Sequence, residues 1–342
     1  MAASIIDVAR AVGVSPSTVS RALRGRDGVS DELRVRIIAV AADLGYTASR
    51  NASSLASGRT CSIGVLAPYV GRWFFGTVVD AAERVFSAAG YDLLLYNLGS
   101  VDSRKRFFAE LPVRKRVDAI LSLLIPTGDE AERLRSLGIP LAITVGGPRP
   151  GFTTVGIDDR AGAELATRHL VNLGHRRIGR IGTQPSAPLY WTTPDLRRRG
   201  YLDVLVDAGI PHDPDLEADG EYTVEGGERA MTRLLTAVRP PTAVFAESDE
   251  MAMGALRALR AHRLRVPEDI AIVGFDDHEL ADVVGLTTVA QPVAEHGTQA
   301  ASLLLRLLRD DTDVPDHVEL PTHLIVRNST APHRGSLHGD IE

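Results

Sequence analysis

Residues 5–24, IIDVARAVGVSPSTVSRALR, constrain the fold more than any other stretch of the chain. Apolar residues recur there at helical spacing, at Ile5, Val8, Ala9 and Val12, which predicts a short helix with one apolar stripe. Gly13 should end this helix, because glycine takes the left-handed conformation without strain. Ser15 is a good N-cap and Pro16 suits a first helical position, so a second helix follows at once. Two short helices joined by a tight glycine turn form a helix-turn-helix, whose second helix can enter a DNA major groove.

An ordinary helical hairpin would give the same periodicity, so the charge distribution has to separate the two interpretations. Residues 1–59 contain eight arginines and five acidic residues, a net charge of +3, whereas the full chain carries −6 and the remainder therefore −9. A small basic head on an acidic body is typical of a DNA-reading module. Ser17 and Arg21 lie four residues apart on the outer face of the second helix, with Pro16 at its exposed tip. We therefore expect this face to meet DNA.

Several segments, which follow one another along the chain in the order typical of one family, carry a specific resemblance. They are residues 7–9, 11–15, 18–21, 29–30, 44–46 and 52–56 in the head, and residues 173–176, 241–245, 251–254 and 274–276 in the body. Together they closely resemble the lactose/galactose repressor (LacI/GalR) family, over nearly all of the chain. The resemblance implies a helix-turn-helix headpiece at residues 1–46, a hinge linker at 47–60, an effector-binding and dimerisation core at 61–332, and a tail at 333–342.

The linker is small and polar apart from Leu55. In the family that it resembles, this segment folds into a hinge helix on the operator, and the leucine matching Leu55 wedges between base pairs in the minor groove. A third headpiece helix should begin after Ser30, bury Leu44 on its inner stripe and stop at Gly45. The expected DNA-binding residues are Ser15, Pro16, Ser17, Thr18, Arg21, Arg24, Arg50 and Leu55.

Beyond residue 60, short apolar runs alternate with helical segments in two series. The runs lack strict alternation, as parallel strands buried on both faces do. The first series has strands at 62–66, 92–96, 119–124 and 141–145, with helices near 76–89, 102–111 and 128–137. The second has strands at 178–182, 221–224, 243–246 and 270–274, with helices near 160–173, 195–208, 225–236 and 249–261. The expected fold is multidomain, an all-α headpiece followed by an α/β core of two doubly wound parallel-sheet lobes.

The resemblance further implies a core like that of periplasmic sugar-binding proteins, with three crossings between lobes near 158–160, 289–292 and 320–322. The N-lobe would hold residues 61–159 and 290–320, and the C-lobe residues 160–289 and 321–332. A ligand would sit between these lobes, where hinge motion can report its presence.

The usual signatures of catalysis and metal binding are not found in the sequence. It has no glycine-rich phosphate loop, no G-x-S-x-G nucleophile elbow and no zinc-spaced Cys/His set. The acidic pairs Asp158–Asp159 and Asp276–Asp277 are better interpreted as caps or solvated charges than as catalytic pairs. Cys61 is the one cysteine, so no intramolecular disulfide can form, and we expect it to be a small buried apolar residue. We predict a binding protein without enzymatic activity, cofactor or metal.

Alignment to the resembled family implies a set of effector-binding residues. They are Phe74, Phe75, Trp191, Thr193, Arg197, Tyr222, Ser248 and Asp276. Flat aromatic rings suit a sugar or base face, while a forked arginine and a carboxylate can orient hydroxyl groups. We expect Arg197 and Asp276 on opposite sides of one cleft. Core packing of the aromatic residues, and a solvated charge for Arg197, are the alternatives.

Two departures from the family pattern leave the identity of the ligand open. Residues 145–147, Val-Gly-Gly, stand where many relatives place an acidic ligand residue, and Ser248 stands where several sugar responders have asparagine.

These observations predict a dimeric, ligand-responsive transcription factor, with repression the favoured mode. The tail after Pro332 lacks the heptad leucines of a tetramerising helix, so we expect a homodimer on a pseudo-palindromic operator. No apolar run follows the start and the longest one, residues 119–126, is too short to span a bilayer, which favours the cytoplasm and no membrane contact. The expected effector is a sugar or sugar derivative. An activator, or a solute-binding protein of the same core fold without DNA binding, remains the alternative.

Overall fold

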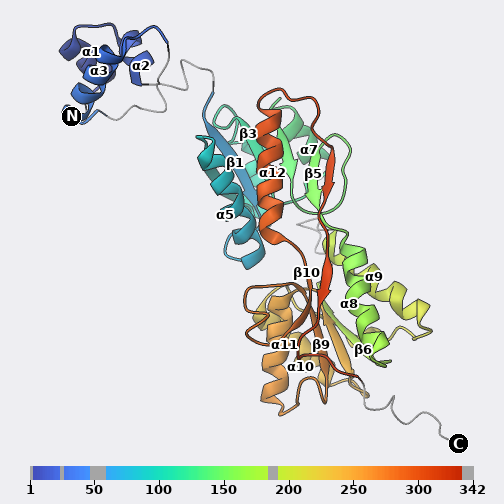
Figure 1. Cartoon of the computed structure of the whole chain (residues 1–342). Helices are drawn as coiled ribbons and strands as arrows, with labels where there is room; N and C mark the ends of the chain where they lie inside the picture. The colour runs from blue at the N-terminus through green and yellow to red at the C-terminus, as the bar shows by residue number, and fades with distance from the viewer. Residues whose placement is uncertain (1–2, 24–26, 47–58, 184–191, 333–342) are drawn as a thin grey trace, which may run out of the picture. The chain divides into compact units, whose positions relative to one another are not determined.

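The computed structural model describes residues 3–23, 27–46, 59–183 and 192–332. The chain divides into two compact units, Met1–Cys61 and Ser62–Glu342, which are coloured along the chain in Figure 1. Four residues predicted to bind DNA or effector lie outside the described residues, namely Arg24, Arg50, Leu55 and Trp191. The tail and nearly all of the predicted hinge linker lie outside them as well.

The first unit is a three-helix bundle of α1 (Ile5–Val12), α2 (Pro16–Leu23) and α3 (Asp31–Asp43). Gly13 ends α1 with φ +79°, and Ser15 caps α2 by accepting a hydrogen bond from the Thr18 amide at 3.1 Å. The bundle core consists of Val8, Ala9, Val12, Val19, Ala22, Ile37 and Ala41. The prediction that Leu44 joins this core is wrong. Its side chain is 42% exposed, because α3 ends at Asp43 and Leu44 is its C-cap.

The second unit contains two six-stranded sheets, each flanked by helices (Figure 1). The N-lobe sheet has the order β11-β5-β4-β3-β1-β2 and the C-lobe sheet the order β12-β10-β9-β8-β6-β7. The N-lobe strands are β1 (Ser62–Ala67), β2 (Asp92–Asn97), β3 (Ala119–Ser122), β4 (Leu141–Ile143), β5 (Thr153–Gly156) and β11 (His317–Glu319). The C-lobe strands are β6 (Ile178–Gly182), β7 (Glu217–Asp219), β8 (Ala243–Ala246), β9 (Ala271–Asp276), β10 (Thr287–Ala290) and β12 (His323–Ile325). The described strand pairs are parallel except for β10 with β12.

Among the described residues, four α-helices belong to each lobe. Those of the N-lobe are α5 (Trp73–Ala88), α6 (Val101–Glu110), α7 (Gly128–Arg135) and α12 (Val293–Leu307). Those of the C-lobe are α8 (Asp159–Asn172), α9 (Thr193–Asp207), α10 (Val224–Leu235) and α11 (Asp249–Ala261), with a short 3₁₀ turn, η1 (Pro214–Leu216). Figure 1 shows the late helix α12 beside α5, so each lobe is built from separate parts of the sequence.

The chain passes between the lobes three times. It crosses from β5 to α8, from β10 to α12, and from β11 to β12. In open parallel sheets the loops at the carboxyl ends of the strands line the ligand crevice. The loops after β1, β4, β8 and β9 therefore come close to the crossing segments, and they form the cleft described below.

Two local predictions are wrong. Residues 221–224 form no strand, because Glu221 and Tyr222 have φ of 53° and 49° in a turn that leads into α10, and the strand lies earlier, at β7. The β7 sequence, Glu-Ala-Asp, is short and polar, so it carries no apolar signal. Cys61 is exposed instead of buried, because it precedes the first strand of the core.

Candidate functional site

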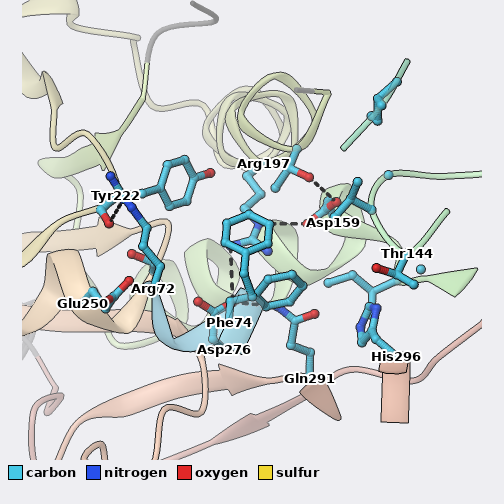
Figure 2. A pocket seen from close by; sticks show the side chains of 18 residues that line it. Arg72, Phe74, Thr144, Asp159, Arg197, Tyr222, Glu250, Asp276, Gln291 and His296 are labelled. Carbon is cyan, nitrogen blue, oxygen red and sulfur yellow. Dashed lines mark hydrogen bonds and ion pairs between the residues drawn. The ribbon is translucent and has the colours of Figure 1, made fainter. Parts of the chain in front are cut away.

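A cleft lies between the N-lobe and the C-lobe, at the carboxyl ends of both sheets (Figure 2). It contains about 770 Å³ of empty space, including its opening to solvent. The described residues predicted to bind an effector all line it, namely Phe74, Phe75, Thr193, Arg197, Tyr222, Ser248 and Asp276. Phe75 also belongs to the hydrophobic core. Its side chain therefore both lines the cleft and packs in the core, the two roles that the sequence left as alternatives.

Arg197, on α9, is buried at the base of the C-lobe wall. Its Nε donates to Asp159 Oδ1 at 2.9 Å, and one Nη donates to the Glu247 carbonyl and lies 3.6 Å from Asp276 Oδ1. The guanidinium carbon lies 3.6 Å from the centroid of the Phe275 ring. Burial opposes its charge, but Asp159 and Asp276 outweigh that effect and raise the pKa of Arg197. Arg197 is therefore a fixed cation and not a solvated surface charge.

Asp276 ends β9 with φ of 112° and belongs to the same lobe as Arg197. The prediction that these two side chains face each other across the cleft is therefore wrong, since α9 and β9 both flank the C-lobe wall. Asp276 Oδ1 accepts a hydrogen bond from Gln291 Nε2 at 2.6 Å. Burial raises the pKa of Asp276 to about 7, although Arg197 and Gln291 oppose the shift. Near neutral pH this carboxyl can either donate or accept a hydrogen bond from a ligand.

A second layer of charges supports this wall from behind. Arg180, inside β6, pairs with Glu247 at 2.5 Å and with Glu217 at 2.8 Å. The Tyr222 hydroxyl donates to Glu247 Oε2 at 3.3 Å, which fixes an aromatic ring at the cleft. Sequence reasoning missed this layer, because β6 reads as an apolar run. An arginine inside a buried strand was the available signal, since it requires an acidic partner.

The N-lobe wall has a different chemistry. Phe74 and Phe75 come from the first turn of α5, Thr144 follows β4, and His296 projects from α12. The Phe74 and His296 rings meet edge to face at 5.8 Å. Burial lowers the pKa of His296 to about 4, so its imidazole is neutral at pH 7. Sequence reasoning did not single out Thr144 or His296.

Two contacts between described residues join the lobes at the rim of the cleft. Arg72, the N-cap of α5, donates from one Nη to the main-chain carbonyls of Glu221 and Tyr222. The neighbouring Trp73 ring lies 4.5 Å from the His278 ring, centroid to centroid. Both contacts connect the start of α5 in the N-lobe with C-lobe loops, so they depend on how far the lobes are closed.

In the headpiece, the structure places the five described DNA-binding candidates at the start of α2 and along it. Ser15, Pro16, Ser17 and Arg21 are exposed and Thr18 is half-buried. The Ser15 hydroxyl lies 2.7 Å from the Ser17 hydroxyl and 2.9 Å from the Thr18 hydroxyl. Val19 and Ala22 point into the bundle core. The polar side chains are therefore on the outward face of α2, as the periodicity predicts.

Comparison with known proteins gives a consistent result for both units. Residues 4–49 match the model of the bacterial regulatory proteins of the lacI family, and residues 167–330 match a periplasmic binding protein-like domain. The repressor CytR of Escherichia coli (strain K12) is 34% identical over 333 residues, which cover 96% of both chains. The chain belongs to the LacI family. The regulator GalR of the same organism is 35% identical over 331 residues, covering 95% of this chain and 94% of GalR.

Solved structures of LacI-family proteins agree with this assignment. The lac repressor dimer bound to operator and the anti-inducer ONPF superposes with a TM-score of 0.84 at 26% identity, covering 97% of this chain and all of that one. The complex of the regulator CelR with cellobiose gives a TM-score of 0.70 at 31% identity, covering 96% of this chain and all of that one. The predicted family and the predicted fold class are confirmed. This LacI-family protein is a DNA-binding transcriptional regulator.

The described residues of this LacI-family regulator contain neither a cluster of metal ligands nor a membrane-spanning helix. In that part of the chain, no three His, Cys, Asp or Glu side chains are grouped so that they could hold a metal ion. No helix there is long and apolar enough to cross a membrane.

Proposed function

We propose that this LacI-family regulator is a homodimeric repressor, and that a sugar or sugar derivative in the cleft sets its affinity for a pseudo-palindromic operator. The observation that carries the proposal is the gathering of the candidate effector residues in one cleft between two lobes. Hinge closure around a ligand in such a cleft changes the relative orientation of the lobes. In a dimer, that change would control whether both headpieces can engage their half-sites.

The proposed DNA-reading surface is the outward face of α2 together with the linker. Arg21 would reach a base edge from this face, and a bidentate arginine contact selects guanine. Ser15, Pro16, Ser17 and Thr18 would contact the backbone and neighbouring bases at the start of the helix. Arg24 and Arg50 would add phosphate contacts, and Leu55 would act in the minor groove as the resembled family implies.

The proposed effector contacts divide by chemistry. Arg197, Asp276, Thr193 and Ser248 would hold hydroxyl groups, while Phe74, Phe75, Tyr222 and Trp191 would cover the faces of the ligand. The similar structures include CelR with cellobiose and a LacI-family regulator from Enterococcus faecium with bound ribose, at 31% and 29% identity. These relatives support a sugar as the ligand class for this chain.

The remaining parts of the proposal follow the family organisation. We place the headpiece at residues 1–46, the hinge at 47–60, the core at 61–332 and the tail at 333–342, in a cytoplasmic protein without enzymatic activity. A surface groove on the C-lobe supports dimerisation, because Val283 and Val284 lie there 78% and 45% exposed beside Met253 and Leu256. The similar lac repressor structure is a dimer.

Selection of bound sequences from random DNA, with the full chain, tests the DNA part of the proposal. We expect a pseudo-palindromic site. Arg21→Ala should lose about 1–3 kcal/mol of discrimination at one base pair and keep its salt-sensitive, non-specific binding. Recovery of no preferred sequence would contradict the proposal, and so would an Arg21→Ala variant that selects the same site with the same preference. A reporter gene behind the selected site then separates repression from activation.

A further inference from the structure

The two walls of the cleft differ in how their polar groups are satisfied. On the C-lobe wall, Asp159, Arg197 and Asp276 are paired with one another or with neighbours. On the N-lobe wall, Thr144 Oγ1 and both ring nitrogens of His296 are buried and make no hydrogen bond of good geometry among the described residues, although the Thr144 main chain is close enough to act on the pKa of the ring. Thr144 is 0% and His296 2% exposed, so these atoms also have little access to bulk water.

Buried polar atoms without partners are rare in folded proteins, because each has given up its hydrogen bonds to water. Here three of them adjoin one cavity. Thr144 and His296 lie next to each other (Figure 2), and the Thr144 main chain opposes the lowering of the His296 pKa by burial. Both residues line the cleft. A ligand in the cleft is therefore positioned to supply the missing partners.

The charges on the N-lobe wall limit the chemical class of ligand that can bind there. The His296 ring is neutral, with one donor and one acceptor nitrogen, and the threonine hydroxyl can donate and accept. Arg72 is the one cation that this lobe contributes to the described cleft lining, and it donates to the carbonyls of Glu221 and Tyr222. No described Asp or Glu of the N-lobe lines the cleft. This wall therefore suits hydroxyl groups, which both donate and accept, and offers little to a phosphate.

We propose that Thr144 and His296 form an N-lobe subsite that binds two neighbouring hydroxyl groups of an uncharged, unphosphorylated sugar. The opposite edge of the same sugar contacts Arg197 and Asp276. This inference rests on the proposed function, namely that the cleft binds a small polyol. Within that function, Thr144 and His296 select a neutral ligand. These two residues belong to the N-lobe, whereas the charged network belongs to the C-lobe.

Binding by the full chain tests the subsite, with ribose, galactose and cellobiose as the neutral probes and glucose 6-phosphate as the charged one. Thermal shifts identify the sugar that binds, and calorimetry then gives its affinity for each variant. We expect His296→Leu and Thr144→Val each to weaken binding about tenfold or more. His296→Gln keeps a donor and an acceptor, and it should retain most of the affinity.

Thr167→Val is the matched control. Thr167 is equally buried, but it lies on α8 and its hydroxyl donates to the Ala163 carbonyl at 2.9 Å, so its removal should leave sugar affinity unchanged. Unchanged affinity in both His296→Leu and Thr144→Val, with the wild type binding a sugar, would overturn the subsite alone. Binding of none of the neutral sugars by the wild type would overturn the proposed function together with the subsite. Preference for glucose 6-phosphate over every neutral sugar would overturn the proposed ligand class.

Discussion

The C-lobe and N-lobe walls of the cleft both contain buried polar side chains but are built in different ways. In the C-lobe, Arg197 is held by Asp159 and Asp276, and Arg180 by Glu247 and Glu217, so each charge stabilises another before a ligand arrives. In the N-lobe, the side chains of Thr144 and His296 are neutral, and their polar atoms make no hydrogen bond of good geometry among the described residues. One wall is thus preorganised, and under the proposed subsite the other would be completed by its ligand. A ligand that satisfies both walls favours the closed arrangement of the lobes.

The largest expected effect is on the C-lobe wall. Arg197→Ala leaves the carboxyls of Asp159 and Asp276 buried without their cation, and it should lower the free energy of unfolding by about 3–5 kcal/mol. Denaturant unfolding of the full chain measures the loss. Arg199→Ala, two residues along the same helix at an exposed position, should change stability by about 0.5 kcal/mol or less. Equal stability of the two variants would show that the paired network does not stabilise this wall.

The next effect is on the pH dependence of stability. The contributions of the two walls to the free energy of unfolding should change with pH in opposite directions. Burial raises the pKa of Asp276 from 3.8 to about 7, so the folded state binds its proton more tightly than the unfolded state. The stability from that proton is present below about pH 4 and is lost as the pH rises to 7. Burial lowers the pKa of His296 from 6.5 to about 4, so its contribution is lost as the pH falls from 6.5 to 4.

Difference measurements between variants separate these two contributions. Relative to wild type, Asp276→Asn should gain stability progressively between pH 4 and pH 7, because asparagine cannot ionise. His296→Leu should gain stability in the opposite direction, as the pH falls from 6.5 towards 4. Chemical unfolding at a series of pH values measures both differences. Two stability differences that change in the same direction with pH would contradict the account of the walls.

A smaller effect is expected at the rim, where Arg72 joins the walls. Arg72→Met removes its hydrogen bonds to the Glu221 and Tyr222 carbonyls and should cost about 1–2 kcal/mol of cross-lobe interaction. The turn at residues 219–224 should then exchange its amide hydrogens faster, while exchange in α1–α3 stays unchanged. Unaltered exchange in the turn would mean that the contact does not restrain the lobes.

The smallest expected effect is on the stability of the N-lobe wall at neutral pH. His296→Leu removes two unpartnered polar atoms and substitutes an apolar side chain of similar size. The free energy of unfolding at pH 7 should therefore rise or fall by about 1 kcal/mol or less. A loss as large as that of Arg197→Ala would show that His296 is a structural residue, contrary to the comparison of the walls.

Local sequence patterns predict some of these features. The apolar spacing of Val8, Val12 and Val19 suffices for the headpiece, since a three-helix bundle is specified by local periodicity. Strands such as β8 and β9 consist mainly of apolar residues and are predicted, whereas the polar edge strand β7 is not. The candidate effector residues came from the family resemblance, and those that the structure describes line one cavity.

The pairings inside the cleft walls could not be predicted, because their partners are far apart in the sequence. Arg180 and Glu247 are 67 residues apart, and Arg197 and Asp159 are 38 apart. The pair Asp158–Asp159 illustrates the limit of local reasoning. Asp158 caps α8 through the Ala161 amide, as expected of a loop carboxylate, but Asp159 is buried against Arg197. His296 has no local signal, since only the assembled cavity leaves its ring without a partner.

The central claim is that a sugar in the cleft and an operator on the headpieces are thermodynamically coupled. The affinity of the full chain for the sugar, measured by calorimetry with and without saturating operator duplex, tests it most directly. Coupling between two sites is reciprocal and typically amounts to about 5- to 150-fold. We expect the two dissociation constants of the sugar to differ by a factor in this range. Identical dissociation constants in the presence and absence of operator would contradict the account.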